Sequence, residues 1–105
     1  MEMRFVYITC KNVSESVQIS RGLLEKKLVA CTNILSGMKS MYWWEGEIVE
    51  DDECVLVAKT QASKMEDLIE EVQKLHSYDV PCVISWALEA SNPAYLKWLA
   101  ESVQN

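Results

Sequence analysis

The run MRFVYITC at residues 3–10 is almost entirely apolar and rich in β-branched and aromatic side chains. Such a composition favours a β-strand. Because side chains alternate along a strand, Phe5 and Tyr7 lie on one face and Val6 and Ile8 on the other. Both faces are apolar, and strands of this kind are usually buried on both sides.

A second two-faced run lies at residues 55–60, VLVAKT, within a strand that is predicted to follow a turn at residues 45–46 and to end near Thr60. Here Leu56 and Ala58 oppose Val55 and Val57. Helices could cover one face of a sheet built from these two strands. Something else must then cover the other face.

Residues 30–44 also indicate that another chain contacts this one. They predict one long strand with a bend or bulge at residues 36–37, followed by a tight turn at residues 45–46. Fully extended, this strand would span about 50 Å, more than a domain of this size needs. Its aromatic end, residues 42–44, would project from the body. Together with the two-faced strands, this arm predicts a homo-oligomer.

Three helices are predicted. The first spans residues 12–27 and opens with the capping-box pattern NVSE, and a second opens with SKME at residues 63–66. A shorter terminal helix, residues 93–102, follows an Asn-Pro pair that suits a helix start. The second helix carries a clear apolar stripe, formed by Met65, Leu68, Ile69, Val72 and Leu75.

With a fourth strand at residues 82–88, the element order is βαββαβ plus an extra C-terminal helix. This is the ferredoxin-like, or split βαβ, pattern. It predicts an α+β fold with a four-stranded antiparallel sheet. A chain of 105 residues is expected to form one domain, residues 1–105.

Composition excludes several functions. Half of the residues are hydrophobic, a quarter are charged, and the formal net charge is −6 with no basic cluster, which argues against nucleic acid as a ligand. No apolar run is long enough to span a membrane, and no leader is visible, so a cytoplasmic protein is expected. The four cysteines are widely spaced within apolar runs, which predicts buried, reduced thiols.

Four stretches carry a family resemblance: YWWEGEI at residues 42–48, VAKT at 57–60, LHSYDVP at 75–81 and NPAYLKWL at 92–99. They closely resemble the signatures of the divalent-cation tolerance (CutA) family, in the same order and over essentially the whole chain. The aromatic-Trp-x-Gly turn and the Asn-Pro-x-Tyr-Leu-x-Trp-Leu run are the most specific of them.

The resemblance implies a ferredoxin-like homotrimer similar to PII signalling proteins. It also implies a link to copper and other divalent metals, with no generally accepted enzymatic activity and no organic cofactor. The implied trimer agrees with the homo-oligomer that the strand pattern predicts.

Metal ligands are expected at one end of the sheet. In the βαββαβ order, the end of the first strand, the end of the second helix and the start of the fourth strand meet at the same edge, which brings Cys10, His76 and Cys82 together. Thiolate and imidazole suit copper or zinc. The alternative for His76, the chain's one histidine, is a solvated residue at a helix end.

The family's copper site is matched only in part. Some members are described as binding copper through a cysteine that matches Cys10 and through two consecutive histidines. His76 matches the second histidine, Leu75 replaces the first, and Ser77 replaces a proline. Two ligands of three would make a weaker site unless Cys82 or another subunit contributes.

Charged residues elsewhere suggest two further sites. Six carboxylates within residues 45–53 could attract hard cations, although a solvated hairpin tip is the simpler interpretation. Lys59 lies in an otherwise apolar strand, where an unpaired ammonium is costly to bury. By resemblance, a cleft between subunits that could hold a small anion is expected to be lined by Lys59, Tyr42, Trp44, Tyr78 and Glu89.

No nucleophile, nucleotide-binding or metalloprotease motif occurs in the sequence. The sequence therefore predicts a non-enzymatic homotrimer that binds copper or another divalent cation and contributes to metal tolerance. The alternative is a PII-like signalling or scaffold trimer that binds a small anionic ligand or a partner protein.

Overall fold

The computed structural model describes residues 2–104. None of the helices in that range has the length and apolar character needed to cross a bilayer. Strands and helices follow one another in the predicted order, with one short 3-10 turn, η1, added before the second helix. The elements are β1 (Met3–Cys10), α1 (Val13–Glu25), β2 (Cys31–Trp44), β3 (Glu47–Gln61), η1 (Ala62–Lys64), α2 (Met65–Leu75), β4 (Val83–Ala87) and α3 (Pro93–Ser102).

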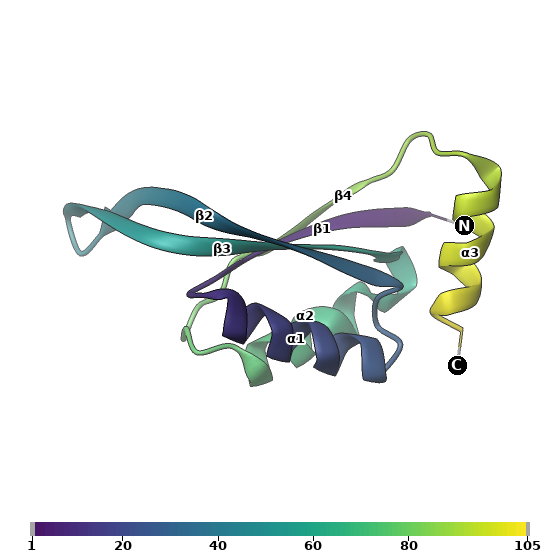
Figure 1. Cartoon of the computed structure of the whole chain (residues 1–105), viewed down its shortest axis with the longest axis horizontal. Helices are drawn as coiled ribbons and strands as arrows, with labels where there is room; N and C mark the ends of the chain where they lie inside the picture. The colour runs from purple at the N-terminus through teal and green to yellow at the C-terminus, as the bar shows by residue number, and fades with distance from the viewer. Residues whose placement is uncertain (1, 105) are drawn as a thin grey trace.

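The four strands form one antiparallel sheet in the order β2-β3-β1-β4. Figure 1 shows α1 and α2 side by side beneath one face of this sheet, whereas α3 stands at the end away from the β2–β3 hairpin. The core lies between the sheet and the two helices. Its fully buried members include Val6, Ile8, Ile19, Leu23, Leu56, Leu68 and Val72.

The opposite face of the sheet is apolar and largely uncovered in the single chain. Cross-strand pairing places Tyr7 beside both Val57 and Ile84, on the face that points away from α1 and α2. We call this surface the open sheet face and define it by Phe5, Tyr7, Leu35, Val57, Ile84 and Trp86. Leu35 is 57% exposed, Ile84 51% and Trp86 48%. The two-faced strands predicted from the sequence are therefore present. Within the chain, α3 contacts the second face near Cys31 and Lys59 through Tyr95, and much of the rest stays exposed.

The β2–β3 hairpin extends beyond the helices (Figure 1). The predicted bulge is confirmed by a register shift between Leu35 and Met38, where Gly37 has a φ of +78°. The tight turn is also confirmed: Glu45 and Gly46 both have positive φ angles, as a two-residue hairpin turn with the right twist requires. The two strands and this turn form a long arm whose apolar side chains are exposed to solvent; Trp43, for example, is 72% exposed.

Of the two helix starts with a capping-box pattern, one agrees with its sequence signal and the other does not. At α1, the Asn12 side chain accepts a hydrogen bond from the Glu15 backbone N–H at 2.9 Å. At α2, the predicted Ser63 cap is wrong: Lys64 is the N-cap residue and makes no side-chain capping bond. The reason is that η1 draws Ser63 into a turn, where its hydroxyl donates to the Gln61 side chain instead.

The Gly22→Ala substitution is expected to stabilise the protein by about 0.5 kcal/mol, a little less than the intrinsic helix preference of alanine over glycine. A Cβ at position 22 would lie 2.6 Å from Leu75 Cδ1, but that atom is the end of a flexible, 40% exposed side chain that can turn into solvent. Urea unfolding measures the change. In a Leu75→Ala background, the gain from Gly22→Ala should approach about 1 kcal/mol. A loss of stability in both backgrounds would mean that α1 and α2 pack too closely to admit a Cβ at position 22.

Candidate functional site

Three buried side chains with metal-ligating atoms meet at the edge of the sheet where β1 ends. Cys10 is the last residue of β1, Glu15 lies in the first turn of α1, and His76 directly follows α2. Their sulfur, oxygen and nitrogen ligand atoms all lie within 4.8 Å of one another. We call these residues the Cys10–Glu15–His76 cluster. The predicted convergence of Cys10 and His76 is present, and Glu15 is an addition.

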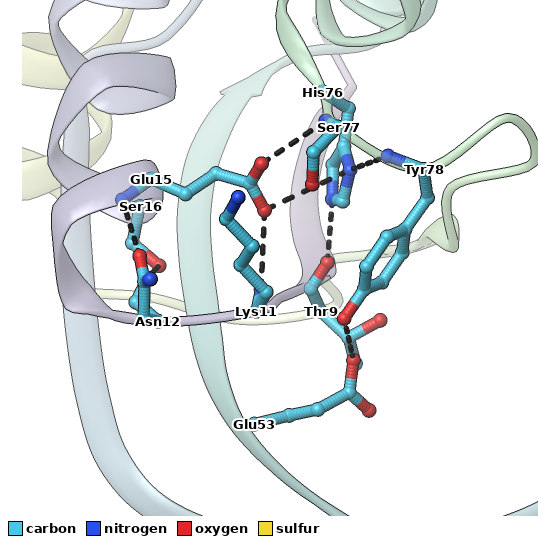
Figure 2. Close-up of polar contacts among 9 residues, drawn as sticks. All are labelled: Thr9, Lys11, Asn12, Glu15, Ser16, Glu53, His76, Ser77 and Tyr78. Carbon is cyan, nitrogen blue, oxygen red and sulfur yellow. Dashed lines mark hydrogen bonds and ion pairs between the residues drawn. The ribbon is translucent and has the colours of Figure 1, made fainter.

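Glu15 joins two loops at this edge, as Figure 2 shows. Its carboxylate accepts hydrogen bonds from the backbone N–H of Lys11 at 3.1 Å and of Ser77 at 3.0 Å. Burial raises the pKa of this carboxyl, but hydrogen bonds from Ser77 and Lys11 outweigh it and leave the pKa below its usual range. The carboxylate is thus a connection between the start of α1 and the segment after α2.

His76 is buried with both ring nitrogens engaged (Figure 2). Nε2 lies 2.8 Å from the carbonyl oxygen of Thr9, which can only accept, and Nδ1 accepts from the Tyr78 backbone N–H at 3.1 Å. These partners specify the neutral imidazole with its proton on Nε2. The alternative of a solvated histidine at a helix end is therefore wrong, because the segment after α2 turns back onto β1 and encloses the ring.

Cys10 completes the cluster as a protonated thiol. Burial raises its pKa to about 11; a hydrogen bond from Ser16 opposes this, while Glu15, Cys54 and Glu53 add to it. A metal needs the thiolate, so a metal that binds here must displace the thiol proton.

The donor set fits a divalent transition metal. Thiolate, imidazole and carboxylate are ligands for zinc and copper. Glu15 Oε1 and His76 Nδ1 are 3.8 Å apart, close to the roughly 3.3–3.8 Å that separates two ligands of one tetrahedral zinc ion. A metal bound to His76 Nδ1 would replace the hydrogen bond that Nδ1 accepts from the Tyr78 N–H, and this loss lowers the net affinity for the metal.

Cys82, the third predicted ligand, lies outside this cluster. It is half-buried and lines a neighbouring cleft. Burial and the charge of Glu53 raise the pKa of its thiol, against a hydrogen bond with Thr9. All four cysteines are free; Cys10 and Cys54 are buried as expected, but Cys31 and Cys82 are only partly so.

The five residues expected around an inter-subunit cleft separate into two groups. Tyr42, Trp44 and Tyr78 line one cleft between the hairpin and the loop after α2. Lys59 lies elsewhere, where its ammonium is 3.3 Å from Asn33 Oδ1, and Glu89 is an exposed residue after β4. Neither lines the cleft in the single chain, so a site that uses all five residues would need a second chain.

Most carboxylates of the acidic run have protein partners. Lys39 pairs with Glu50 and Asp52, while the hydroxyls of Tyr42 and Tyr78 donate to Asp51 and Glu53 respectively. These contacts favour the interpretation of the run as a solvated hairpin surface.

Comparison with known proteins identifies close relatives. The family model of the CutA1 divalent ion tolerance protein matches residues 4–102. A protein named Divalent-cation tolerance protein CutA from Thermotoga maritima is 43% identical over 101 residues, which are 96% of this chain and 99% of that protein. The Protein CutA homolog of Xenopus laevis is 44% identical over 97 residues, 92% of this chain but only 64% of its own length.

Solved structures agree with the sequence matches. CutA1 from Oryza sativa superposes with a TM-score of 0.97 at 37% identity and covers 100% of this chain and 96% of that one. The structure titled periplasmic divalent cation tolerance protein CutA, from Archaeoglobus fulgidus, gives a TM-score of 0.94 at 38% identity and covers 97% of this chain and 99% of that one.

Proposed function

Because this chain belongs to the CutA1 divalent ion tolerance family, we propose that it binds copper or another divalent cation at the Cys10–Glu15–His76 cluster and so contributes to metal tolerance. The observation that carries the proposal is the approach of the three ligand atoms to within 4.8 Å. We place the protein in the cytoplasm, where its four free thiols would stay reduced.

The binding unit that we propose is a PII-like homotrimer of ferredoxin-like subunits. The open sheet face and the projecting hairpin supply apolar surface of the kind that protein partners cover. A trimer would bury the second face of each sheet against neighbouring subunits. We propose a binding rather than a catalytic role, since the Cys10 thiol is protonated and buried and is therefore a poor nucleophile.

Copper binding is expected to strengthen about tenfold for each pH unit between pH 6.5 and 8.5, because the Cys10 proton, with a pKa of about 11, must leave when the thiolate binds. Titration against a chelator of known pH dependence, under reducing conditions, measures the slope. The Cys10→Ser variant should lose this slope and bind about a hundredfold more weakly or worse, since even residues that only orient a ligand typically contribute 10–100-fold.

The same substitution at the two half-buried thiols, Cys31 and Cys82, provides the comparison. Cys31→Ser should leave copper affinity unchanged, because Cys31 lies outside the cluster. Cys82→Ser tests whether the third predicted ligand contributes. Unchanged affinity and slope in Cys10→Ser would refute the proposed site.

The alternative function, a PII-like trimer that binds a small anion, depends on Lys59 instead. The Lys59 ammonium lies 3.7 Å from Cys31 Sγ and 3.3 Å from Asn33 Oδ1. If Lys59→Met abolished a cellular phenotype that survives Cys10→Ser and His76→Ala, the signalling function would be favoured.

A further inference from the structure

A separate cleft lies between the hairpin and the loop after α2. It has a volume of about 640 Å³, within the range of small-molecule sites. Its walls are formed by Ser40, Met41, Tyr42 and Trp44 of β2, by Glu53 of β3 and by the loop residues 78–80. Tyr78 separates this cleft from the Cys10–Glu15–His76 cluster: its backbone N–H bonds His76, while its hydroxyl donates to Glu53 at 2.6 Å (Figure 2).

The formal charges in the cleft are negative. Glu53 and Asp79 are among its lining residues, and Asp51 accepts a hydrogen bond from the lining residue Tyr42. None of the lining residues within the described chain is lysine, arginine or histidine. Burial and Glu53 raise the pKa of Tyr78, and the bond to Asp51 raises that of Tyr42, so both phenols remain neutral. Within one subunit, this charge pattern repels anions.

Three aromatic side chains, Tyr42, Trp44 and Tyr78, line the same cleft. Aromatic rings attract cations through their quadrupole, and most strongly cations that are weakly hydrated. Met41 and Val80 add apolar surface. Rings and aliphatic groups suit an organic ammonium with an apolar body better than a hydrated metal ion, which prefers oxygen ligands.

We propose that this cleft binds a small organic cation, a protonated amine with an apolar body, whose ammonium pairs with Glu53 while its apolar part contacts the three aromatic side chains. The site is distinct from the proposed metal site and does not depend on it.

Phenethylammonium is a suitable probe, and two-dimensional amide and indole NMR of the intact protein locates it. We expect shifts concentrated at the Trp44 indole and the Tyr78 amide. Its affinity should exceed that of the neutral 2-phenylethanol by about tenfold or more, as expected for a charge-assisted contact, and 3-phenylpropionate should bind most weakly. Glu53→Gln, which keeps an acceptor for Tyr78, should remove the preference for the cation.

Two neighbours on the same hairpin are matched controls. Glu47→Gln makes the same charge change, and Trp43→Leu the same ring deletion as Trp44→Leu, but neither residue lines the cleft. Both controls should bind phenethylammonium like the parent, whereas Trp44→Leu should lose about tenfold. Equal affinity for the alcohol, equal effects of Glu53→Gln and Glu47→Gln, or no binding because another subunit fills the cleft would each overturn the proposal.

Discussion

The Ile84→Glu variant is expected to be a monomer at micromolar concentrations at which we expect the parent protein to be a trimer. Ile84 is 51% exposed on the open sheet face of the single chain, next to Tyr7, and its exposure there means that the subunit can fold without it. In the proposed trimer, each substitution removes about 2 kcal/mol of apolar burial and adds a carboxylate whose burial costs several kcal/mol more. Sedimentation equilibrium over a concentration series measures the change.

The control for this variant is Val13→Glu on α1. Val13 is 45% exposed, so it offers a similar side chain with similar exposure, but on the helical layer. It should remain a trimer, and both variants should keep the circular dichroism spectrum of the parent. A parent protein that is monomeric, or an Ile84→Glu protein that stays trimeric, would show that the open sheet face is not the subunit interface.

The fold was predictable because its signals are local. The apolar runs of β1 and β3 can be recognised without knowledge of their neighbours, and the bulge near Gly37 and the turn at residues 45–46 follow from backbone angles that glycine favours. The start of α2 was not predictable in this way. Whether Ser63 caps a helix depends on the path of the chain after β3, and η1 uses that residue otherwise.

Topology predicts which edge of the sheet holds the candidate site, but not which side chains point into it. Strand order brings Cys10 and His76 to one edge, but it does not say that Cys82, at the same edge, points into a different cleft. The sequence analysis did not include Glu15 among the candidate ligands, because its place in the capping-box pattern already accounted for a glutamate there. That pattern could have identified it. A capping glutamate turns back towards the residues before its helix, and in this chain these residues are at the end of β1.

The hydrogen bonds of the cluster give it a structural role that does not require a metal. Glu15 holds Lys11 and Ser77, and His76 holds Thr9 and Tyr78, so two side chains fasten the loop after α2 to β1 and α1. A metal bound to His76 Nδ1 would replace the hydrogen bond from the Tyr78 N–H. The free energy of metal binding must therefore exceed the free energy lost with that hydrogen bond.

Glu15→Ala is expected to lower the free energy of unfolding by about 3 kcal/mol at neutral pH, because it leaves two partly buried backbone donors, those of Lys11 and Ser77, without their charged acceptor. Glu66→Ala is the control: Glu66 is also in the first turn of a helix but is exposed, so its loss should cost only about 0.5 kcal/mol. Urea unfolding at equal protein concentration compares the two.

The pH dependence separates the hydrogen bonds of Glu15 from the mere filling of space. Hydrogen bonds from Ser77 and Lys11 leave the pKa of Glu15 lowered despite its burial, so the unfolded chain takes up a proton first as the pH falls. The stability that Glu15 contributes is thus fully present above the ordinary pKa of 4.5 and is lost as the pH drops through the lower folded value. The difference in stability between the parent and Glu15→Gln should therefore shrink in acid. A difference that stays constant with pH would mean that Glu15 acts through its packing and not through its charge.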